Sequence, residues 1–382
     1  MKKSVKYLSI ILCTLILSGC WDTTEPERLV YATGMGIDYK DGEIVVFLQI
    51  MNMSGLAKTE GGSSIPNRVD VGRAAGKTLD EAIFNLYHTS DRRIYWGHLS
   101  FIIFSEKALK NDLLRPATDF LDRYRETRYR IFYYATKEPL KEAMRIGPIE
   151  SVSMAFSRLS DPEGNFKQSS LIQPLDLREL IIRLDEPSHV AALPVIKITK
   201  QWFGEKESRK NILIQDVAVV SKKKYYGIFP KDKIGGTRLI FKDFTRDNID
   251  LFKGTDKVIT AVVYDKKEKI IPIVRGDEVK FKIKLKLKAN IELVKQPTKM
   301  KDFEKEIKKV LKNEIKTSYK YGASKGVDVF HLSEILYREH NKTWKKIEKD
   351  GRIPLTKDLI DSIDINVTLQ NSGKDKLTPV FE

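Results

Sequence analysis

Hydrophobic and polar residues alternate most regularly between residues 279 and 293, where the sequence reads VKFKIKLKLKANIEL. A period of two places successive side chains on opposite faces of a β-strand. The pattern therefore predicts a strand with one apolar face and one lysine face. The apolar face, toward a core, carries Phe281, Ile283, Leu285 and Leu287. The opposite face carries Lys280, Lys282, Lys284, Lys286 and Lys288.

Helical periodicity follows this strand. The apolar residues of 302–321 recur on one side of a helix and are Phe303, Ile307, Val310, Leu311 and Ile315. Gly322 is typical of a helix end. A second helix is predicted over 328–349 with Asp328 as its cap, and alternation over 363–369 predicts a closing strand.

The N-terminal half mixes both periodicities. YATGMGIDYKDGEIVVFLQI predicts two strands joined at Asp41-Gly42, because Asp-Gly supplies the positive φ angles of a tight hairpin. Thr78-Leu79-Asp80-Glu81 is a capping box, which predicts a helix that reaches about His88. Strands are further predicted at 96–104 and 129–135, and helices at 116–124, from 139 and after 174.

Residues 213–274 are predicted to be mostly β-structure. DVAVVSKKKYYGIF indicates two strands about a basic turn, and KVITAVVYDKKEKIIPIV indicates two more about another. The sequence thus predicts an α+β fold of three dissimilar mixed domains built on mainly antiparallel sheets. Their predicted bounds are 20–206 for the N-terminal domain, 207–275 for a β-rich middle domain and 276–382 for the C-terminal domain.

Residues 1–19 have the pattern of a lipoprotein signal peptide. Lysines precede an apolar run from Tyr7 to Leu17, which is shorter than the roughly 20 residues of a transmembrane helix. Leu17-Ser18-Gly19-Cys20 then matches a lipobox, in which Cys20 receives the lipid and becomes the first mature residue. Cys13 leaves with the signal, so the mature chain cannot form an internal disulfide. The alternative is an ordinary signal followed by an incidental cysteine.

The chain is basic, with 68 Lys and Arg against 52 Asp and Glu and a formal net charge of +16. Loss of the three signal lysines lowers this charge to +13. Residues 276–382 carry 24 Lys and Arg against 17 Asp and Glu, about half of the mature surplus. Export argues against nucleic acid as the partner. The lysine strand is either a solvated or edge-protecting face, or a contact for anionic lipid or an acidic partner.

Motifs for catalysis and cofactor binding are incomplete. The stretch from Gly72 to Thr78 has three residues between its glycines where a P-loop needs four, and Gly34-Met35-Gly36 lacks the third glycine of a dinucleotide fingerprint. Metal-ligand spacing is absent among the histidines, which are His88, His98, His189, His331 and His340. We therefore expect no enzymatic activity, no cofactor and no metal.

Several stretches occur together in the order of a known family. They are GCWD at 19–22, GMGID at 34–38, GHLSFIIFSEKAL at 97–109, VAVVSKKKYYG at 217–227 and DVFHLSEILYREHNKTWKKI at 328–347. With them the chain resembles the C subunits of bacterial spore germinant receptors, the Ger(x)C lipoproteins. His331 and Ser333 stand where this family usually has glycines, and a second tryptophan expected after Trp344 is absent.

This resemblance implies a non-catalytic, lipid-anchored subunit of a complex that detects small nutrients in a dormant spore. The implied partners are two integral-membrane receptor subunits, A-type and B-type, and membrane lipid reached through the acyl anchor on Cys20, with no nucleic acid. The implied location is the outer face of the inner spore membrane, and the implied role is assembly and signal coupling. Two other classes stay open: a solute-binding lipoprotein that feeds a transporter, and a cell-wall hydrolase, for which the sequence has no motif.

Overall fold

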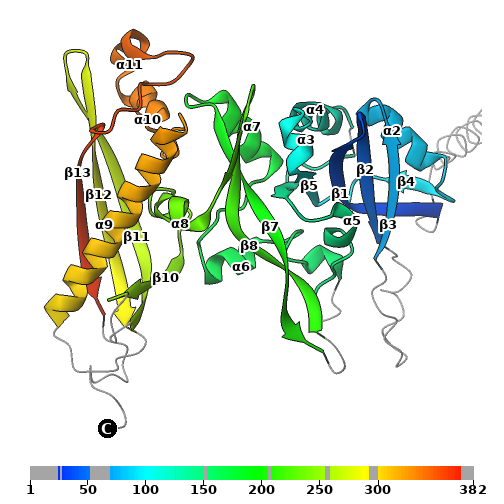
Figure 1. Ribbon diagram of the computed structural model, residues 1–382, viewed down its shortest axis with the longest axis horizontal. Coiled ribbons are helices and arrows are strands. Elements are labelled where there is room, and N and C mark those ends of the chain that lie inside the picture. Colours follow the sequence, from blue (N-terminus) through cyan, green and yellow to red (C-terminus); the bar gives the residue numbers. More distant parts are fainter. Residues whose placement is uncertain are drawn as a thin grey trace, which may run out of the picture.

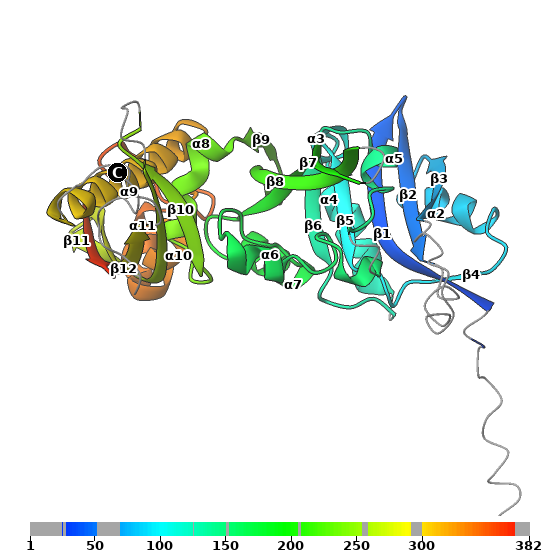
Figure 2. The same cartoon turned by 90° about the horizontal axis from the view of Figure 1, so that it is seen from below.

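The computed structural model describes residues 25, 28–51, 69–124, 126–149, 153–204, 208–253, 259–291 and 300–370. The strands form two sheets, a first sheet of nine strands and a second sheet of four, at opposite ends of an elongated molecule (Figures 1 and 2). Helices accompany both sheets (Figure 1). The prediction of an α+β fold is confirmed.

The first sheet has the order β3-β2-β1-β5-β6-β7-β8-β9, with β4 paired to β1. Its strands are β1 (Leu29–Lys40), β2 (Glu43–Met51), β3 (Asp70–Gly76), β4 (Arg93–Tyr95), β5 (Phe101–Ser105), β6 (Phe132–Thr136), β7 (Val190–Phe203), β8 (Ser208–Ser221) and β9 (Tyr225–Phe229). The sheet is antiparallel at both flanks, while β1, β5, β6 and β7 pair in parallel at its centre. The sequence did not predict this parallel centre.

Two local features of the first sheet fold as predicted. Asp41 and Gly42 have φ angles of 54° and 86° in the hairpin between β1 and β2. The hydroxyl of Thr78 accepts a hydrogen bond from the Glu81 amide at 3.2 Å, and the Glu81 carboxylate accepts one from the Lys77 amide at 2.8 Å. The predicted capping residues thus begin α2 (Leu79–Tyr87), with the carboxylate bonded to the amide one residue before the N-cap Thr78.

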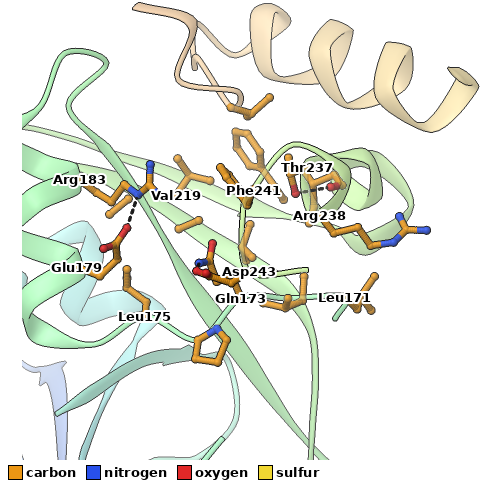
Figure 3. A pocket seen from close by; sticks show the side chains of 18 of the residues that line it. Leu171, Gln173, Leu175, Glu179, Arg183, Val219, Thr237, Arg238, Phe241 and Asp243 are labelled. Carbon is orange, nitrogen blue, oxygen red and sulfur yellow. Dashed lines mark hydrogen bonds and ion pairs between the residues drawn. The ribbon is translucent and has the colours of Figure 1, made fainter. Parts of the chain in front are cut away.

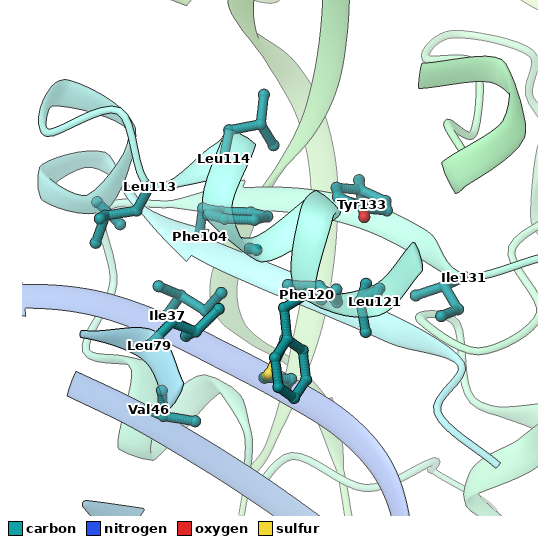
Figure 4. Packing of buried hydrophobic residues seen from close by; sticks show 14 of the residues in the cluster. Ile37, Val46, Leu79, Phe104, Leu113, Leu114, Phe120, Leu121, Ile131 and Tyr133 are labelled. Carbon is teal, nitrogen blue, oxygen red and sulfur yellow. The ribbon is translucent and has the colours of Figure 1, made fainter. Parts of the chain in front are cut away.

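The centre of the first sheet is covered on both faces. One face, with Phe104 of β5, packs against α2, α3 (Glu106–Lys110), α4 (Leu114–Arg123) and α7 (Leu177–Asp185) (Figure 4). The other face, with Ile103, packs against α5 (Leu140–Ala143). Because both faces are covered, every residue of FIIFS in β5 and FYYAT in β6 is buried, and apolar residues do not alternate with polar ones. The remaining helical segments of this region are η3 (Met154–Phe156) and α6 (Glu163–Gln168).

The second sheet has the order β10-β11-β12-β13. Its strands are β10 (Arg246–Leu251), β11 (Ile259–Arg275), β12 (Glu278–Ile291) and β13 (Ile360–Leu369). Helix α9 (Met300–Ser324) lies along one face (Figure 1), and its Phe303, Ile307, Leu311 and Ile315 belong to the same core as the apolar residues of β12. The predicted strand over 279–293 and the predicted helix over 302–321 are therefore confirmed where the structure describes them.

The segment 259–275 does not form the two predicted strands about a turn. It is one strand, β11, interrupted by a β-bulge between Tyr264 and Lys267. The bulge absorbs the irregularity at Asp265, whose φ angle is 49°, so the chain keeps its direction.

The predicted helix over 328–349 is divided in two. Helix α10 (Leu332–Glu339) ends at His340, whose backbone is not helical, and α11 (Asn341–Ile347) follows. Asp328 nevertheless caps α10, because its carboxylate accepts hydrogen bonds from the amides of Leu332 at 3.0 Å and Ser333 at 2.8 Å.

The described residues of the segment 207–275, predicted as a middle domain, form no sheet of their own. Strands β8 and β9 extend the first sheet, whereas β10 and β11 begin the second. The short helices α8 (Lys231–Ile234) and η4 (Gly235–Leu239) connect them. Local alternation predicts that a strand pairs but does not predict which sheet it joins. The division at 206 and 275 into three domains stays a prediction.

Candidate functional site

The lysine strand β12 is an inner strand of the second sheet. It pairs with β11 on one side and with β13 on the other. Its apolar residues Phe281, Ile283, Leu285 and Leu287 are at most 3% exposed. The interpretation of these lysines as protection of a free strand edge is therefore wrong, because β12 has no free edge. The lysines lie on the face opposite α9.

Three of the predicted lysines have acidic partners. Lys280 lies 3.0 Å from Glu278, Lys282 lies 2.8 Å from Asp364 and Lys288 lies 2.7 Å from Asp265, in each case between the amine and a carboxylate oxygen. Hydrogen bonding and attraction to these carboxylates raise the pKa of each lysine. The charge of these three positions is thus largely compensated by neighbours on the sheet.

The other two predicted lysines belong to a group of four. Lys284 lies directly opposite Lys269, and Lys286 lies directly opposite Lys267, in the antiparallel pairing of β11 and β12. All four side chains are exposed, and none has an ion pair within the part of the chain that the structure describes. Like charges directly opposite each other repel. We call these four residues the lysine quartet.

Lys267 and Lys269 were not predicted as part of this face, because their sequence resembles a turn. A relevant signal was present, since the stretch from 259 to 275 contains no glycine and no asparagine to favour a tight turn. Reading it as one strand would have placed both lysines beside β12.

Cys20, the predicted lipid attachment site, lies outside the described residues. Among the residues that are described, no helix combines the length and apolar character needed to cross a bilayer. Within the same residues, no group of three or more His, Cys, Asp or Glu side chains is placed to hold a metal ion.

The two sheets meet where α7 and the start of β7 contact α10. The buried hydroxyl of Ser188 donates a hydrogen bond to the Asp328 carboxylate at 2.8 Å, and the Ser188 amide donates to the carbonyl of Gly351 at 3.2 Å. On the surface above them, the Arg338 guanidinium lies 3.1 Å from the Glu186 carboxylate. Asp328 therefore caps α10 and also links the two halves of the molecule.

A cavity lies beside this contact, and we call it the junction cavity (Figure 3). Its empty volume, including the opening to solvent, is about 860 Å³. One wall comes from β7, β8, β9 and residues 170–175, and the other from η4, residues 241–244 and residues 327–331. Apolar side chains such as Val219 and Phe241 dominate these walls.

His331 lines the junction cavity at the start of α10. Its side chain is 12% exposed, and its Nδ1 is buried without a hydrogen-bond partner, 4.0 Å from the nearer Glu334 oxygen. Burial, and secondarily the charge of Arg183, lower the pKa of His331 to about 3, so the ring is neutral at ordinary pH. Its φ angle of 53° is left-handed, a conformation that favours glycine. In the sequence, His331 was noted among the histidines without metal-ligand spacing and as a residue that replaces a usual family glycine, but not as the lining of a cavity.

Two family models match the chain in order. The spore germination protein N-terminal domain matches residues 22–198, and the C-terminal domain described as spore germination B3/GerAC like matches residues 215–373. These matches meet near the middle of the molecule, within or beside β7 and β8.

Individual relatives agree with these matches. Spore germination protein KC of Bacillus subtilis (strain 168) is 25% identical over 368 residues, which cover 91% of this chain and 90% of that protein. Spore germination protein B3 of the same organism is 26% identical over 162 residues, 42% of each chain. The crystal structure of the GerBC protein has a similar fold, with a TM-score of 0.56, 15% identity, and coverage of 92% of this chain and 99% of that one. The chain belongs to the Ger(x)C family of spore germination proteins.

Proposed function

We propose that the chain is the lipid-anchored C subunit of a nutrient-germinant receptor and that it serves assembly and signalling rather than catalysis. The observation that carries this proposal is the pair of family matches, which together extend over nearly the whole mature chain. The relatives are named as spore germination proteins. The partners we propose are the A-type and B-type integral-membrane subunits, on the outer face of the inner spore membrane.

The architecture favours this function over a solute-binding lipoprotein. Solute-binding proteins close two similar lobes around a ligand by hinge motion. Here the first sheet has nine strands with a parallel centre, whereas the second has four strands and one covering helix face. Two such unlike sheets do not form a symmetric clamp.

We further propose that the lysine quartet contacts anionic lipid headgroups. Protein interfaces are usually anchored by aromatic residues, but the quartet presents amines on flexible stems. Strand β1 begins soon after Cys20, and it lies at the end of the molecule away from the second sheet (Figure 1). An acyl anchor at one end and a basic face at the other would hold the molecule along the membrane, and two weak signals together give stable attachment.

Replacement of Cys20 tests the anchor. Cys20→Ala removes the thiol that accepts the lipid, so we expect the protein to leave the membrane fraction or to accumulate as an unprocessed precursor. The A-type and B-type subunits should then no longer co-purify with it from membranes. Cys13→Ala is the matched control, because it changes the other cysteine of the chain and leaves the lipobox intact. Lipidated, membrane-bound protein recovered from Cys20→Ala would refute the proposal.

A further inference from the structure

We propose that the junction cavity binds a small uncharged molecule that has an apolar body and one hydrogen-bonding group, and that this group bonds to the ring of His331. The inference is independent of the proposed function, because it rests on the cavity alone. The cavity lies between the two sheets, the charges in its walls are paired, and His331 has an unusual position in it.

The position and lining of the cavity suit a small organic ligand. Binding sites for such molecules often lie between domains and combine apolar walls with few polar groups. The junction cavity lies between the two sheets, and its walls are mainly apolar. Val190, Val217 and Phe229 from the first sheet and Val327 from the other side are at most 8% exposed.

The arginines in the walls already have carboxylate partners, and the Asp243 carboxylate accepts a hydrogen bond from the Gln173 side-chain amide at 2.7 Å. Arg183 lies 2.7 Å from Glu179 and 3.7 Å from Glu334, and its guanidinium stands 5.5 Å from the centre of the Phe241 ring (Figure 3). A charged ligand would have to displace one of these carboxylates. The internal compensation therefore favours a neutral ligand over an amino acid.

The charge of Arg238 is also compensated by carboxylates. It lies 2.8 Å from Asp247 through Nε and 2.9 Å from Glu314 through Nη1, close enough for ion pairs, although the Nε hydrogen does not point at the Asp247 oxygen. Both arginines of the cavity thus belong to the framework that holds its walls.

His331 is a polar residue in the cavity wall whose ring has an unpaired nitrogen. Its buried Nδ1 has no partner, and a buried unpaired donor or acceptor costs about 1–3 kcal/mol. Its left-handed backbone is a second cost, since a residue other than glycine is strained there. Two unfavourable features at one cavity-lining position indicate that the ring serves ligand binding and not stability. A neutral imidazole offers one donor and one acceptor, so it suits a hydroxyl or a carbonyl group.

The test uses two probes of nearly the same shape, p-cresol and toluene, which differ by one hydroxyl. The protein is the full chain carrying Cys20→Ala, so that no acyl chain competes for the cavity. Methyl NMR spectra report binding directly at the valines of the walls, including Val219 and Val327. We expect both probes to shift these methyl signals saturably. The dissociation constant of p-cresol should be lower by roughly 2- to 12-fold, the value of one hydrogen bond.

Substitutions at His331 test its role. His331→Gly is compatible with the left-handed backbone and removes the ring. The affinity for p-cresol should therefore fall to the affinity for toluene, and the affinity for toluene should not change. His331→Asn also tolerates this conformation and keeps a polar group, so it should retain part of the preference. An unchanged preference for p-cresol in His331→Gly would overturn the role of the ring.

A substitution that fills the cavity tests the location. Ala192 lies on β7, is exposed and lines the cavity, so Ala192→Phe occupies its space without crowding the core. We expect this variant to lose both probes while Lys200→Phe, an exposed change on the same strand outside the cavity, keeps them. Retained binding in Ala192→Phe, or no saturable shift in the starting protein, would overturn the site. Saturable shifts of the same methyls by L-alanine would overturn the assignment of an uncharged ligand.

Discussion

The two sheets bury their strands differently. In the first sheet, neighbouring residues of β5 enter two separate cores, with Ile102 in one and Ile103 in the other. In the second sheet, Ile283 of β12 is fully buried against α9 whereas its neighbour Lys284 is exposed. In a sheet covered on both faces, all side chains pack in a core. A sheet covered on one face has a second face open to solvent, and in the second sheet this open face carries the charged side chains.

The largest effects should distinguish these two kinds of burial. Ile102→Ala and Ile103→Ala should each lower the free energy of unfolding by about 2–5 kcal/mol, because each leaves a cavity in a closed core. Ile283→Ala should cost a similar amount, whereas Lys284→Ala should change stability by no more than about 0.5 kcal/mol. Urea denaturation measures all four. A large cost for Lys284→Ala would show that the outer face of the second sheet is not free.

The next effect concerns the contact between the regions. Asp328→Ala removes the acceptor for the amides of Leu332 and Ser333 and for the hydroxyl of Ser188. We expect a loss of about 3 kcal/mol, because buried donors without acceptors cost about 1–3 kcal/mol each. Ser188→Ala is the matched variant, since it removes only the bond across the junction and should cost about 1 kcal/mol.

Unfolding curves also show whether this contact couples the two regions. If it does, Asp328→Ala should split one transition into two, observed separately by fluorescence and by circular dichroism. Equal costs for Asp328→Ala and Ser188→Ala would contradict the dual role of the carboxylate.

The sequence was informative where the deciding interactions are local. The Asp41-Gly42 hairpin and the capping box of Thr78 depend on residues a few positions apart, and both are confirmed. The alternation of β12 also predicted which side chains are buried. These features follow from backbone geometry and from the period of the hydrophobic pattern.

The features that the sequence did not predict depend on residues far apart in the chain. The lysine quartet requires the register between β11 and β12, and the bulge at Asp265 that sets it resembles a turn in sequence. The junction cavity combines walls from residues 170–175 with others from 327–331, which no local pattern connects. The parallel centre of the first sheet likewise depends on crossovers, whereas the sequence suggested mainly hairpins.

A change of pH should have a smaller effect on stability, through His331 at the junction. The ring of His331 faces Arg183 of α7, Glu334 of its own helix and the ring of Phe241. In the unfolded chain it takes up a proton near its ordinary pKa of 6.5, but in the folded protein only near 3. Between these values the unfolded state binds more protons, so the free energy of unfolding falls as the pH falls. The contribution of this group is at most about 1.4 kcal/mol for each pH unit.

His331→Asn isolates this contribution, because asparagine tolerates the left-handed backbone and does not titrate. Denaturation of both proteins between pH 6.5 and pH 4 should show a shallower loss of stability in the variant. Identical pH dependence in the two proteins would contradict a buried neutral histidine at the junction.

The smallest effect on folding should come from the open face of the second sheet, and here the lysine quartet is the test. Changing Lys267, Lys269, Lys284 and Lys286 together to Gln should alter stability by no more than about 0.5 kcal/mol, and upward if anything, because like charges that lie opposite each other are removed. Flotation of the full chain carrying Cys20→Ala with phosphatidylglycerol-containing vesicles should nevertheless weaken at least tenfold, since each lysine near an anionic surface contributes about 1 kcal/mol. Vesicle binding by the protein with the unchanged quartet should also fall as salt screens the charges.

The control replaces four exposed lysines of α9, namely Lys301, Lys305, Lys316 and Lys320, which removes the same charge from the covered side. If both quadruple variants lose vesicle binding equally, net charge and not the open sheet face attracts the membrane, and the contrast between the two sheets is one of packing alone.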